Sequence, residues 1–330
     1  MTCKFFLRPL VLFLIFTPHL FAQKIPDDPF AHTFSIVARD TVTGNIGVAV
    51  QSHWFNVGKV VTWARPGVGA VATQALVNAS FGPLGLDLLE KGYSPETALD
   101  TLLKHDDGRD FRQVAIIDAH GRTAGYTGSK NIKMAGNITE DNFSVQANMM
   151  LNNTVWPAMA KAFKTKKGTL AERMVAALKA AQAEGGDIRG QQSAALIVVR
   201  GNSTGKPWED RLIDLRVEDS PHAVDEIARL LKVHQAYEHM NNGDAAIGNN
   251  EVSKALEEYH AAQKMFPENI EMKYWTAVSL ANVGRIDDAL PIFREVFNAN
   301  GHWKELTRRI VPVGMLQVDD HTLKRILNVK

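Results

Sequence analysis

The stretch TFSIVARD, at residues 33–40, is typical of a β-strand that begins on a hydroxyl residue and continues with Ile, Val and Ala. A turn at Thr43-Gly44-Asn45 joins it to a second run, GVAVQSH at residues 47–53, and together they predict a hairpin. A third run, GVGAVATQA at residues 67–75, consists mostly of small residues, which would let a substrate backbone approach closely. Because sheets covered on both faces are rich in such residues, we expect a buried sheet here.

The patterns that follow come in blocks of strands and blocks of helices. Ser94, Pro95 and Glu96 supply an N-cap, a proline at the first helical position and a first-turn acid. Thr169 and Glu172 form a capping-box pattern at the start of another helix. This order of blocks favours sheets layered with helices over an alternating doubly wound fold. We expect helices at 82–90, 94–104, 154–163 and 170–183, and strands at 33–39, 46–51, 60–63, 68–74, 112–118, 123–127, 143–148, 194–200 and 212–217.

From residue 221 onward the chain reads as helix, and it contains an internal repeat. Three small or aromatic residues recur after 34 residues, which is the period of the tetratricopeptide (TPR) repeat. The recurring pairs are Ala255 with Ala289, Tyr259 with Phe293, and Ala262 with Val296. We therefore predict a TPR-like module over residues 220–330 that packs on a helix at 223–239 and either binds a protein partner or braces the first domain. The alternative is a generic helical hairpin.

The first 22 residues have the features of a secretory signal peptide. Lys4 and Arg8 precede an apolar run at 10–16, Pro18 interrupts it, and Ala22 offers a cleavage point. We expect a secreted or periplasmic protein in which residues 23–32 form an extended leader. An uncleaved membrane anchor is the alternative. The chain's single cysteine, Cys3, lies in this segment, so the mature protein should have neither a disulfide nor a thiol nucleophile.

Charge and motifs exclude several partners. Removing Lys4 and Arg8 leaves 35 basic against 36 acidic residues, a balance that argues against nucleic acid. No later apolar run is long enough to cross a bilayer, so no membrane partner is expected after signal removal. The histidines lack metal-site spacing, and no phosphate-binding or dinucleotide-binding loop occurs. We expect no metal and no cofactor.

Several further motifs, together with the opening hairpin, carry a resemblance to a known family. They are FGPLGLDLL at 81–89, RQVAIID at 112–118, GR at 121–122, YTG at 126–128, ANMM at 147–150, LAER at 170–173 and GGDIRGQQSAAL at 185–196. In this order they resemble the DUF1028 proteins, a bacterial family in the N-terminal-nucleophile (Ntn) hydrolase superfamily. The resemblance implies an α+β chain in which an αββα sandwich at 33–219 precedes the all-α module.

The same resemblance implies chemistry at Thr33. An Ntn hydrolase attacks an amide with the hydroxyl of its first residue, and the free α-amine of that residue takes the proton. Here residues 23–32 would remain attached after signal cleavage. Either a second cut occurs between His32 and Thr33, or the amine stays blocked. The alternative is that Thr33 is simply a β-branched residue at the start of a strand.

Other candidate catalytic residues lie near the ends of the first two strands. Arg39 and Asp40 could neutralise each other near the nucleophile or orient the substrate, or they could pair at a hairpin turn. Ser52 and His53 end the second strand, and His53 could act as a second base because its pKa lies in the useful range. The alternative for His53 is a packed core residue.

Candidate substrate-binding residues are neutral or paired polar side chains. Thr73, Gln74 and Asn78 offer donors and acceptors for an amide or an oxyanion. Asn148, Asp187, Arg189 and Gln192 lie in the motifs named above, and Arg189 could bind a carboxylate or form a structural ion pair. Two functions remain open: an exported hydrolase of a small amide or peptide-like substrate, and a non-catalytic binding protein that acts through its helical module.

Overall fold

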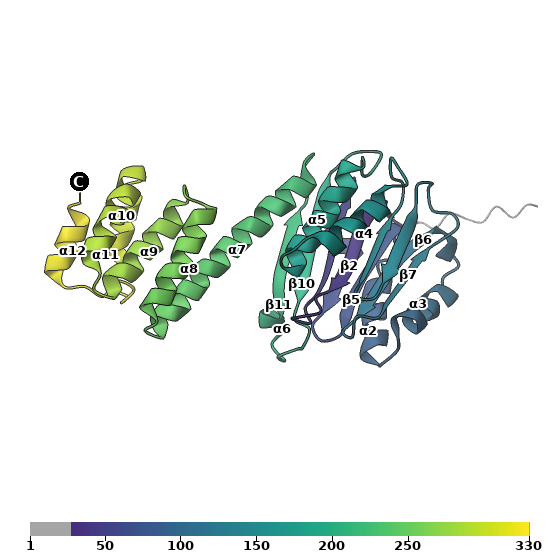
Figure 1. Cartoon of the computed structure of the whole chain (residues 1–330), viewed down its shortest axis with the longest axis horizontal. Coiled ribbons are helices and arrows are strands. Elements are labelled where there is room, and N and C mark those ends of the chain that lie inside the picture. Colours follow the sequence, from purple (N-terminus) through teal and green to yellow (C-terminus); the bar gives the residue numbers. More distant parts are fainter. Residues whose placement is uncertain (1–27, 330) are drawn as a thin grey trace, which may run out of the picture.

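The computed structural model describes residues 28–329, so the predicted signal peptide and Cys3 lie outside the described residues. Figure 1 shows a part in which sheets and helices are layered, and a separate helical part, joined by the long helix α7 (Ala223–Gly248). The expected α+β chain with a helical C-terminal region is confirmed.

The larger sheet has six antiparallel strands among the described residues, in the order β11-β10-β3-β2-β9-β8. The hairpin predicted from residues 33–53 lies at its centre, because β2 pairs with β3 in the register Thr33 with Ser52. The strands are β2 (Thr33–Arg39), β3 (Ile46–Ser52), β8 (Gly136–Glu140), β9 (Phe143–Ala147), β10 (Ser193–Val199) and β11 (Arg211–Val217).

The second sheet is also antiparallel, in the order β1-β5-β6-β7, with β4 pairing on β5. Two expectations are corrected here. The predicted strand at 60–63 is the end of helix α1 (Gly58–Val61) followed by β4, and residues 30–31 of the predicted extended leader form a strand on β5. The strands are β1 (Phe30–Ala31), β4 (Thr62–Arg65), β5 (Gly69–Leu76), β6 (Arg112–Asp118) and β7 (Thr123–Thr127).

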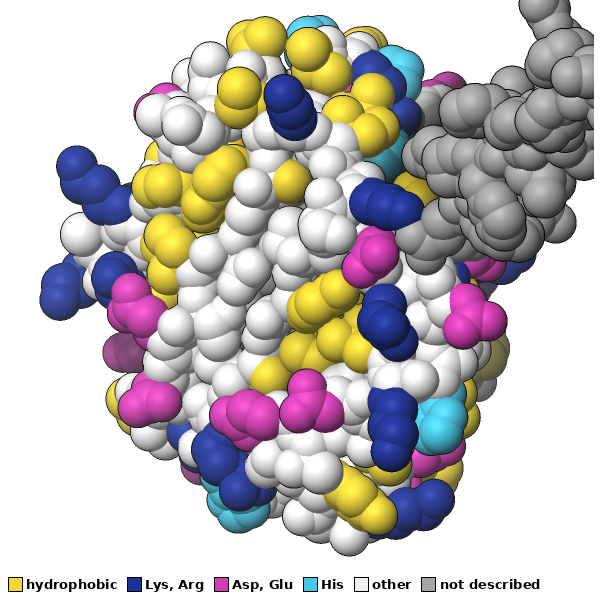
Figure 2. Space-filling view, turned by 90° about the vertical axis from the view of Figure 1, so that its right-hand side faces the viewer, with side chains coloured by type: hydrophobic (Ala, Val, Ile, Leu, Met, Phe, Trp, Pro, Cys, Tyr) yellow, Lys and Arg dark blue, Asp and Glu magenta, His cyan; other side chains and the backbone are white. Residues whose placement is uncertain are grey.

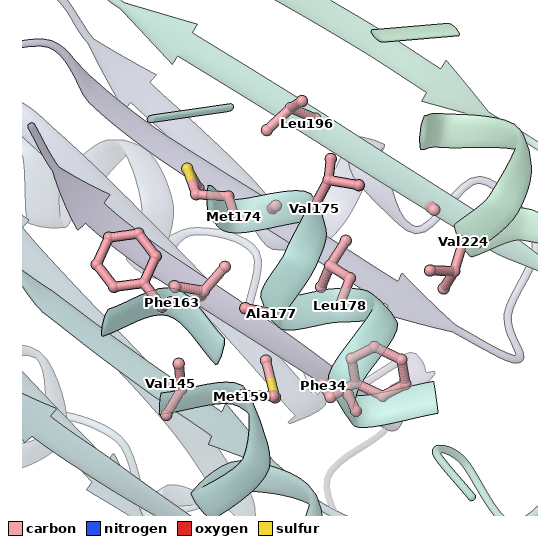
Figure 3. Packing of buried hydrophobic residues seen from close by; sticks show 14 of the residues in the cluster. Phe34, Val145, Met159, Phe163, Met174, Val175, Ala177, Leu178, Leu196 and Val224 are labelled. Atoms are coloured by element: carbon pink, nitrogen blue, oxygen red, sulfur yellow. The ribbon is translucent and has the colours of Figure 1, made fainter. Parts of the chain in front are cut away.

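Helices cover the outer face of each sheet. α4 (Val155–Thr165) and α5 (Leu170–Ala183) pack on the larger sheet, and α2 (Phe81–Glu90) and α3 (Pro95–Lys104) pack on the other. Figure 3 shows the first of these layers, where Met174 and Leu178 of α5 lie in one buried cluster with Phe34 and Leu196 of the sheet. The capping box of Thr169 is confirmed, as is the Ser94 cap. Short helices η1 (Arg109–Phe111) and α6 (Pro207–Asp210) complete this part.

The space between the two sheets has two different ends. At one end it is apolar, where Val37, Val48 and Ile197 of the larger sheet belong to one buried cluster with Ala70 and Ile117 of the other. At the other end the inward-facing side chains are polar and fully buried. Strand alternation places them on the same face as the apolar cluster. Among them are Thr33, Ser35, Ser52, Gln74, Gln113, Gln146 and Asn148.

The C-terminal helices form antiparallel pairs beyond the middle of α7. The six recurring positions are all fully buried, so the 34-residue repeat is a repeat of packing positions. A β-carbon at Gly243 of α7 would lie 2.3 Å from the Tyr259 ring, which shows how closely α7 and α8 approach. The helices are α8 (Val252–Met265), α9 (Ile270–Asn282), α10 (Ile286–Ala299), α11 (His302–Ile310) and α12 (Asp320–Leu327).

We predict that Ala255→Trp disrupts the helical part alone. Ala255 is fully buried, so a Trp side chain would force neighbouring helices apart at a cost of about 1–3 kcal/mol. Hydrogen exchange should rise in α8–α10 and stay unchanged in β2 and β5. Ser253→Trp, at an exposed position of the same helix, is the control and should leave exchange unchanged. Faster exchange in β2 as well would show that the two parts form one cooperative unit.

Candidate functional site

The polar end of the space between the sheets surrounds the junction of the leader and β2. His32 and Thr33 are 2% and 0% exposed, so the peptide bond between them is enclosed by protein. The carbonyl oxygen of His32 accepts hydrogen bonds from Ser52 Oγ at 2.6 Å and from Arg189 Nη2 at 3.0 Å. The Thr33 hydroxyl donates to the Ala31 carbonyl at 2.5 Å, so it points back along the leader. One neutral and one cationic donor therefore polarise the carbonyl that precedes Thr33.

Asp187 fixes the direction of the Arg189 guanidinium. Its Oδ1 accepts from the Arg189 backbone N at 2.9 Å and from Nε at 3.0 Å, and its Oδ2 accepts from Nη2 at 2.8 Å. The His53 backbone N donates to Oδ2 as well, at 3.2 Å. The Asp187 carboxylate is fully buried and saturated with donors. Arg189 thus forms a structural ion pair, one of its two predicted roles, and the same guanidinium reaches the His32 carbonyl.

A network of buried carboxamides links the two sheets, and Gln113 determines the direction in which its hydrogen bonds are donated. Gln113 Nε2 donates to the carbonyls of Ala147 at 2.9 Å and Gly136 at 3.3 Å, which are acceptors only. Gln113 Oε1 must therefore face the opposite side, where it accepts from Gln74 Nε2 at 2.7 Å and Asn148 Nδ2 at 2.8 Å. The orientation of one amide thus determines the orientation of the next two.

This polarity determines the tautomer of His32. Since Asn148 donates through Nδ2 to Gln113, its Oδ1 faces His32 Nδ1, at 2.6 Å, and must accept a hydrogen bond from it. His32 therefore carries its proton on Nδ1, while its buried Nε2 has no hydrogen-bond partner within the described residues. Burial is the main cause that lowers the pKa of His32 below its usual 6.5, and nearby Arg189 lowers it further. The ring is neutral where the leader is docked.

Two predicted catalytic residues lie at the other end of β2. Arg39 ends that seven-residue strand, roughly 20 Å along it from Thr33. Asp40 accepts hydrogen bonds from the backbone N of Val42 and Thr43, so it stabilises the β2–β3 turn. The hairpin-turn alternative describes this pair better than a role beside the nucleophile, although Arg39 bonds Asn142 and not Asp40.

Three predicted substrate-binding residues have side chains directed elsewhere. Thr73 points to the helix-covered face of its sheet, where its hydroxyl donates to the Asn78 carbonyl, and Asn78 Oδ1 accepts from Ser80 ahead of α2. Gln192 donates to Asp219 at 3.2 Å on the surface. His53, expected either as a base or as a core residue, is exposed at the mouth of the site.

Sequence reasoning missed four residues of the site: His32, Ser35, Gln113 and Gln146. Gln146 Nε2 donates to Ser35 Oγ at 2.5 Å, and Ser35 Oγ in turn donates to Gln74 Oε1 at 2.6 Å. For Ser35, Gln113 and Gln146 the available signal was the alternation of single polar residues on the inward-facing positions of otherwise apolar strands, whereas His32 precedes β2 and had no such signal.

Backbone strain concentrates around the same place. Ala75, Met134 and Met149 have φ values of +74°, +57° and +60°, which are unfavourable for residues other than Gly, Asn and Asp. Ala75 pairs with Ala31 of the leader, and Met149 follows the Asn148 that bonds His32. Such strained residues cluster at functional sites, so the strain supports a functional role for this end of the sheets.

Apolar side chains surround the mouth of the site. Backbone bonds from Met149 N to Ile132 O and from Ile188 N to Met149 O tie together the loops beside Asn148 and Arg189. These loops expose Ile132, Leu151 and Ile188 at 44%, 51% and 58%. Figure 2 shows that apolar patches also lie among interspersed acidic and basic side chains on the face turned away from the helical part.

Metal ligands and membrane spans are absent from the part of the chain that the structure describes. Residues 28–329 contain no group of three or more His, Cys, Asp and Glu side chains that could hold a metal ion. Across the same residues, every helix is too short or too polar to cross a bilayer.

Known proteins are similar to the layered part of this chain. The model of a family described as "Family of unknown function (DUF1028)" matches residues 33–227. The crystal structure of protein SPO2555 from Silicibacter pomeroyi, a DUF1028 protein, is 32% identical with a TM-score of 0.55, covering 61% of this chain and 88% of that chain. None of the curated proteins matches significantly. The family match begins at Thr33 and leaves the docked leader outside it.

We predict that Gln113→Leu destabilises the fold by about 2–4 kcal/mol, because it leaves several buried donors and acceptors of both sheets unpaired. Denaturant unfolding measures this. Gln192→Leu, which removes one exposed hydrogen bond, is the control and should change stability by less than about 0.5 kcal/mol. Similar effects of the two substitutions would contradict the central place of Gln113.

We predict that the leader docks less firmly in acid. Because docking lowers the pKa of His32 from 6.5, protonation favours the undocked state, so docking is strongest above pH 6.5 and weakens as the pH falls below it. Hydrogen exchange at the Val77 amide, which bonds the Pro29 carbonyl, should lose protection at pH 5.5 relative to pH 7.5 after correction for intrinsic rates.

The control is His32→Asn, whose amide can donate to Asn148 but does not titrate. The same pH dependence in this variant would assign the effect to another group.

Proposed function

Since this chain belongs to the DUF1028 family, whose function is unknown, we propose a function from its own geometry: it is an Ntn-type hydrolase. It cleaves an amide or peptide-like bond in a small substrate, and Thr33 is its nucleophile once residues up to His32 have been removed. The observation that carries this proposal is the His32 carbonyl, held by Ser52 and Arg189 at the bond whose cleavage would free the Thr33 amine.

The site supports a self-cleavage step at this bond. The Thr33 hydroxyl attacks the His32 carbonyl carbon, and the charge that develops on the oxygen is stabilised by Ser52 and Arg189. The C–N bond breaks, the proton lost by the Thr33 hydroxyl passes to the Thr33 nitrogen, which becomes the free amine, and His32 is held as an ester on the Thr33 oxygen. Water then hydrolyses the ester, giving a His32 carboxylate and restoring the hydroxyl.

The freed residue would contain both groups that the reaction requires. An α-amine has a pKa near 8, so at neutral pH a useful fraction is unprotonated and can take the proton from the Thr33 hydroxyl. Ser52 and Arg189 would hold the substrate carbonyl oxygen as they now hold that of His32. Gln74 and Asn148 hold Thr33 itself, because Gln74 Nε2 and the Asn148 backbone N both donate to its carbonyl, at 3.3 Å and 3.1 Å.

Location and partner belong to the same proposal. The sequence pattern of residues 1–22 supports export, so the hydrolase would act outside the cytoplasm. The buried 34-residue repeat supports a TPR-like module that binds a protein partner or braces the layered part.

One observation favours a second candidate, a non-catalytic binding protein. Several polar groups of the docked leader have partners in the layered part. β1 pairs with β5, His32 bonds Asn148, and Asp28 lies 2.7 Å from Arg112. A leader that is never released would block the Thr33 amine permanently. The helical part would then carry the function.

We predict that Thr33→Ala abolishes hydrolysis while the fold survives, since it removes only the attacking hydroxyl and one methyl group. Thr33→Ser should retain activity because the oxygen remains. The assay is hydrolysis of a panel of acyl-amide substrates by the purified proteins. Thr123→Ala, which alters a threonine that also begins a strand, is the control and should behave as wild type. Equal activity of Thr33→Ala and wild type would remove Thr33 from the mechanism.

A further inference from the structure

The leader occupies the site in the manner of an added strand. β1 pairs antiparallel with β5, Ala31 opposite Ala75, and the Val77 N donates to the Pro29 carbonyl at 2.9 Å. β4 pairs with the same side of β5 only over residues 69–72. The leader therefore pairs with the part of the β5 edge that β4 leaves free. The carbonyl of its last residue, His32, accepts hydrogen bonds from Ser52 and Arg189.

Each leader position has a distinct environment. Ala31 is fully buried, so its place has room only for a small side chain, and His32 is 2% exposed in a closed pocket beside Asn148. Phe30, by contrast, is 51% exposed. Asp28 pairs with Arg112, which is itself only 3% exposed. The groove that holds the leader thus restricts the side chains at positions 31 and 32 and tolerates variation at position 30.

We propose that this groove is the acyl side of the substrate site and takes an extended peptide with a small residue followed by a hydrogen-bond-donating residue at the cleaved bond. This rests on the proposed function. Release of the leader would leave the Val77 N–H, Asn148 Oδ1, the Ser52 hydroxyl and one N–H of Arg189 without their present partners, while the bonds of Arg189 to Asp187 remain. Each such group is costly if it stays unpaired in a buried site. A peptide restores all of these bonds, whereas a compact amide restores only those at the carbonyl.

The fixed orientation of Asn148 adds a rule of specificity. Its Oδ1 faces the His32 pocket because its Nδ2 donates to Gln113. The residue in that pocket must therefore donate a hydrogen bond, as a neutral imidazole or a carboxamide does. A carboxylate would bring an acceptor against an acceptor in a buried site and should be rejected.

Synthetic peptides test the proposal. The probe is Asp-Pro-Phe-Ala-His, the sequence of residues 28–32, titrated into a Thr33→Ala chain that begins at residue 33. A peptide with Trp in place of Ala31, and one with Glu in place of His32, should each bind at least about tenfold more weakly. A peptide with Ala in place of Phe30 should change affinity by less than about threefold. Equal affinity for all four peptides, or no binding of the first, would overturn the proposal.

A second measurement uses the chain with its leader attached. The Thr33→Ala chain that retains residues 28–32 should not bind the peptide, because the leader fills the groove, whereas adding Ala31→Trp to the same chain should displace the leader and let the peptide bind. Equal binding by both proteins, or by neither, would contradict the assignment of the groove.

Hydrolysis separates this proposal from the one on which it rests. Selective peptide binding without hydrolysis of any amide by the wild-type chain would leave the groove assigned and refute the hydrolase. Hydrolysis of small amides without selective peptide binding would refute the peptide groove and leave the hydrolase.

Discussion

The orientation of the Gln113 carboxamide is the constraint on which the site depends. Two backbone carbonyls fix it, and through Gln74 and Asn148 it determines which atom faces Thr33 and which faces His32. Because these groups are buried, a reversed amide would leave several of them unpaired, at a cost of about 1–3 kcal/mol each. The network therefore holds both sides of the His32–Thr33 bond in one geometry.

The long helix α7 begins beside the site and ends in the helical part. The Val224 N donates to Gln191 Oε1 at 2.9 Å, and the Ser220 N donates to the Gln192 carbonyl at 2.6 Å. The loop that carries Arg189 is thus bonded to the first turn of a 26-residue helix, about 39 Å long. A partner bound to α8–α12 would have a continuous covalent and hydrogen-bonded connection to the proposed oxyanion donors.

Local signals in the sequence predicted most of the fold, and the failures have local causes too. The capping box gave the start of α5 at residue 170, while β8 was missed because its residues GNITE lie at a polar sheet edge. β1 was missed because its pairing with β5 spans over forty residues and the leader's prolines suggested an extended tether.

Of the predicted site residues, five lie around Thr33: Ser52, Gln74, Asn148, Asp187 and Arg189. Since neighbours in a strand face opposite ways, Thr73 and Gln74 could not both point inward, and Arg39 could not lie near Thr33 at the far end of one strand. Alternation marks Gln113 as an inward-facing polar residue, but its role in orienting the network could not be found from sequence because that role depends on contacts between sheets.

The identity of the first residue of the mature protein tests the central claim most directly. Intact-mass measurement and N-terminal sequencing of native protein, followed over time after synthesis, would report it. The account predicts a chain that begins at Thr33 in wild type and one that keeps residues 28–32 in Thr33→Ala. A wild-type protein that hydrolyses amides while His32 remains attached would contradict it, because the Thr33 nitrogen would then be an amide and could not act as the base.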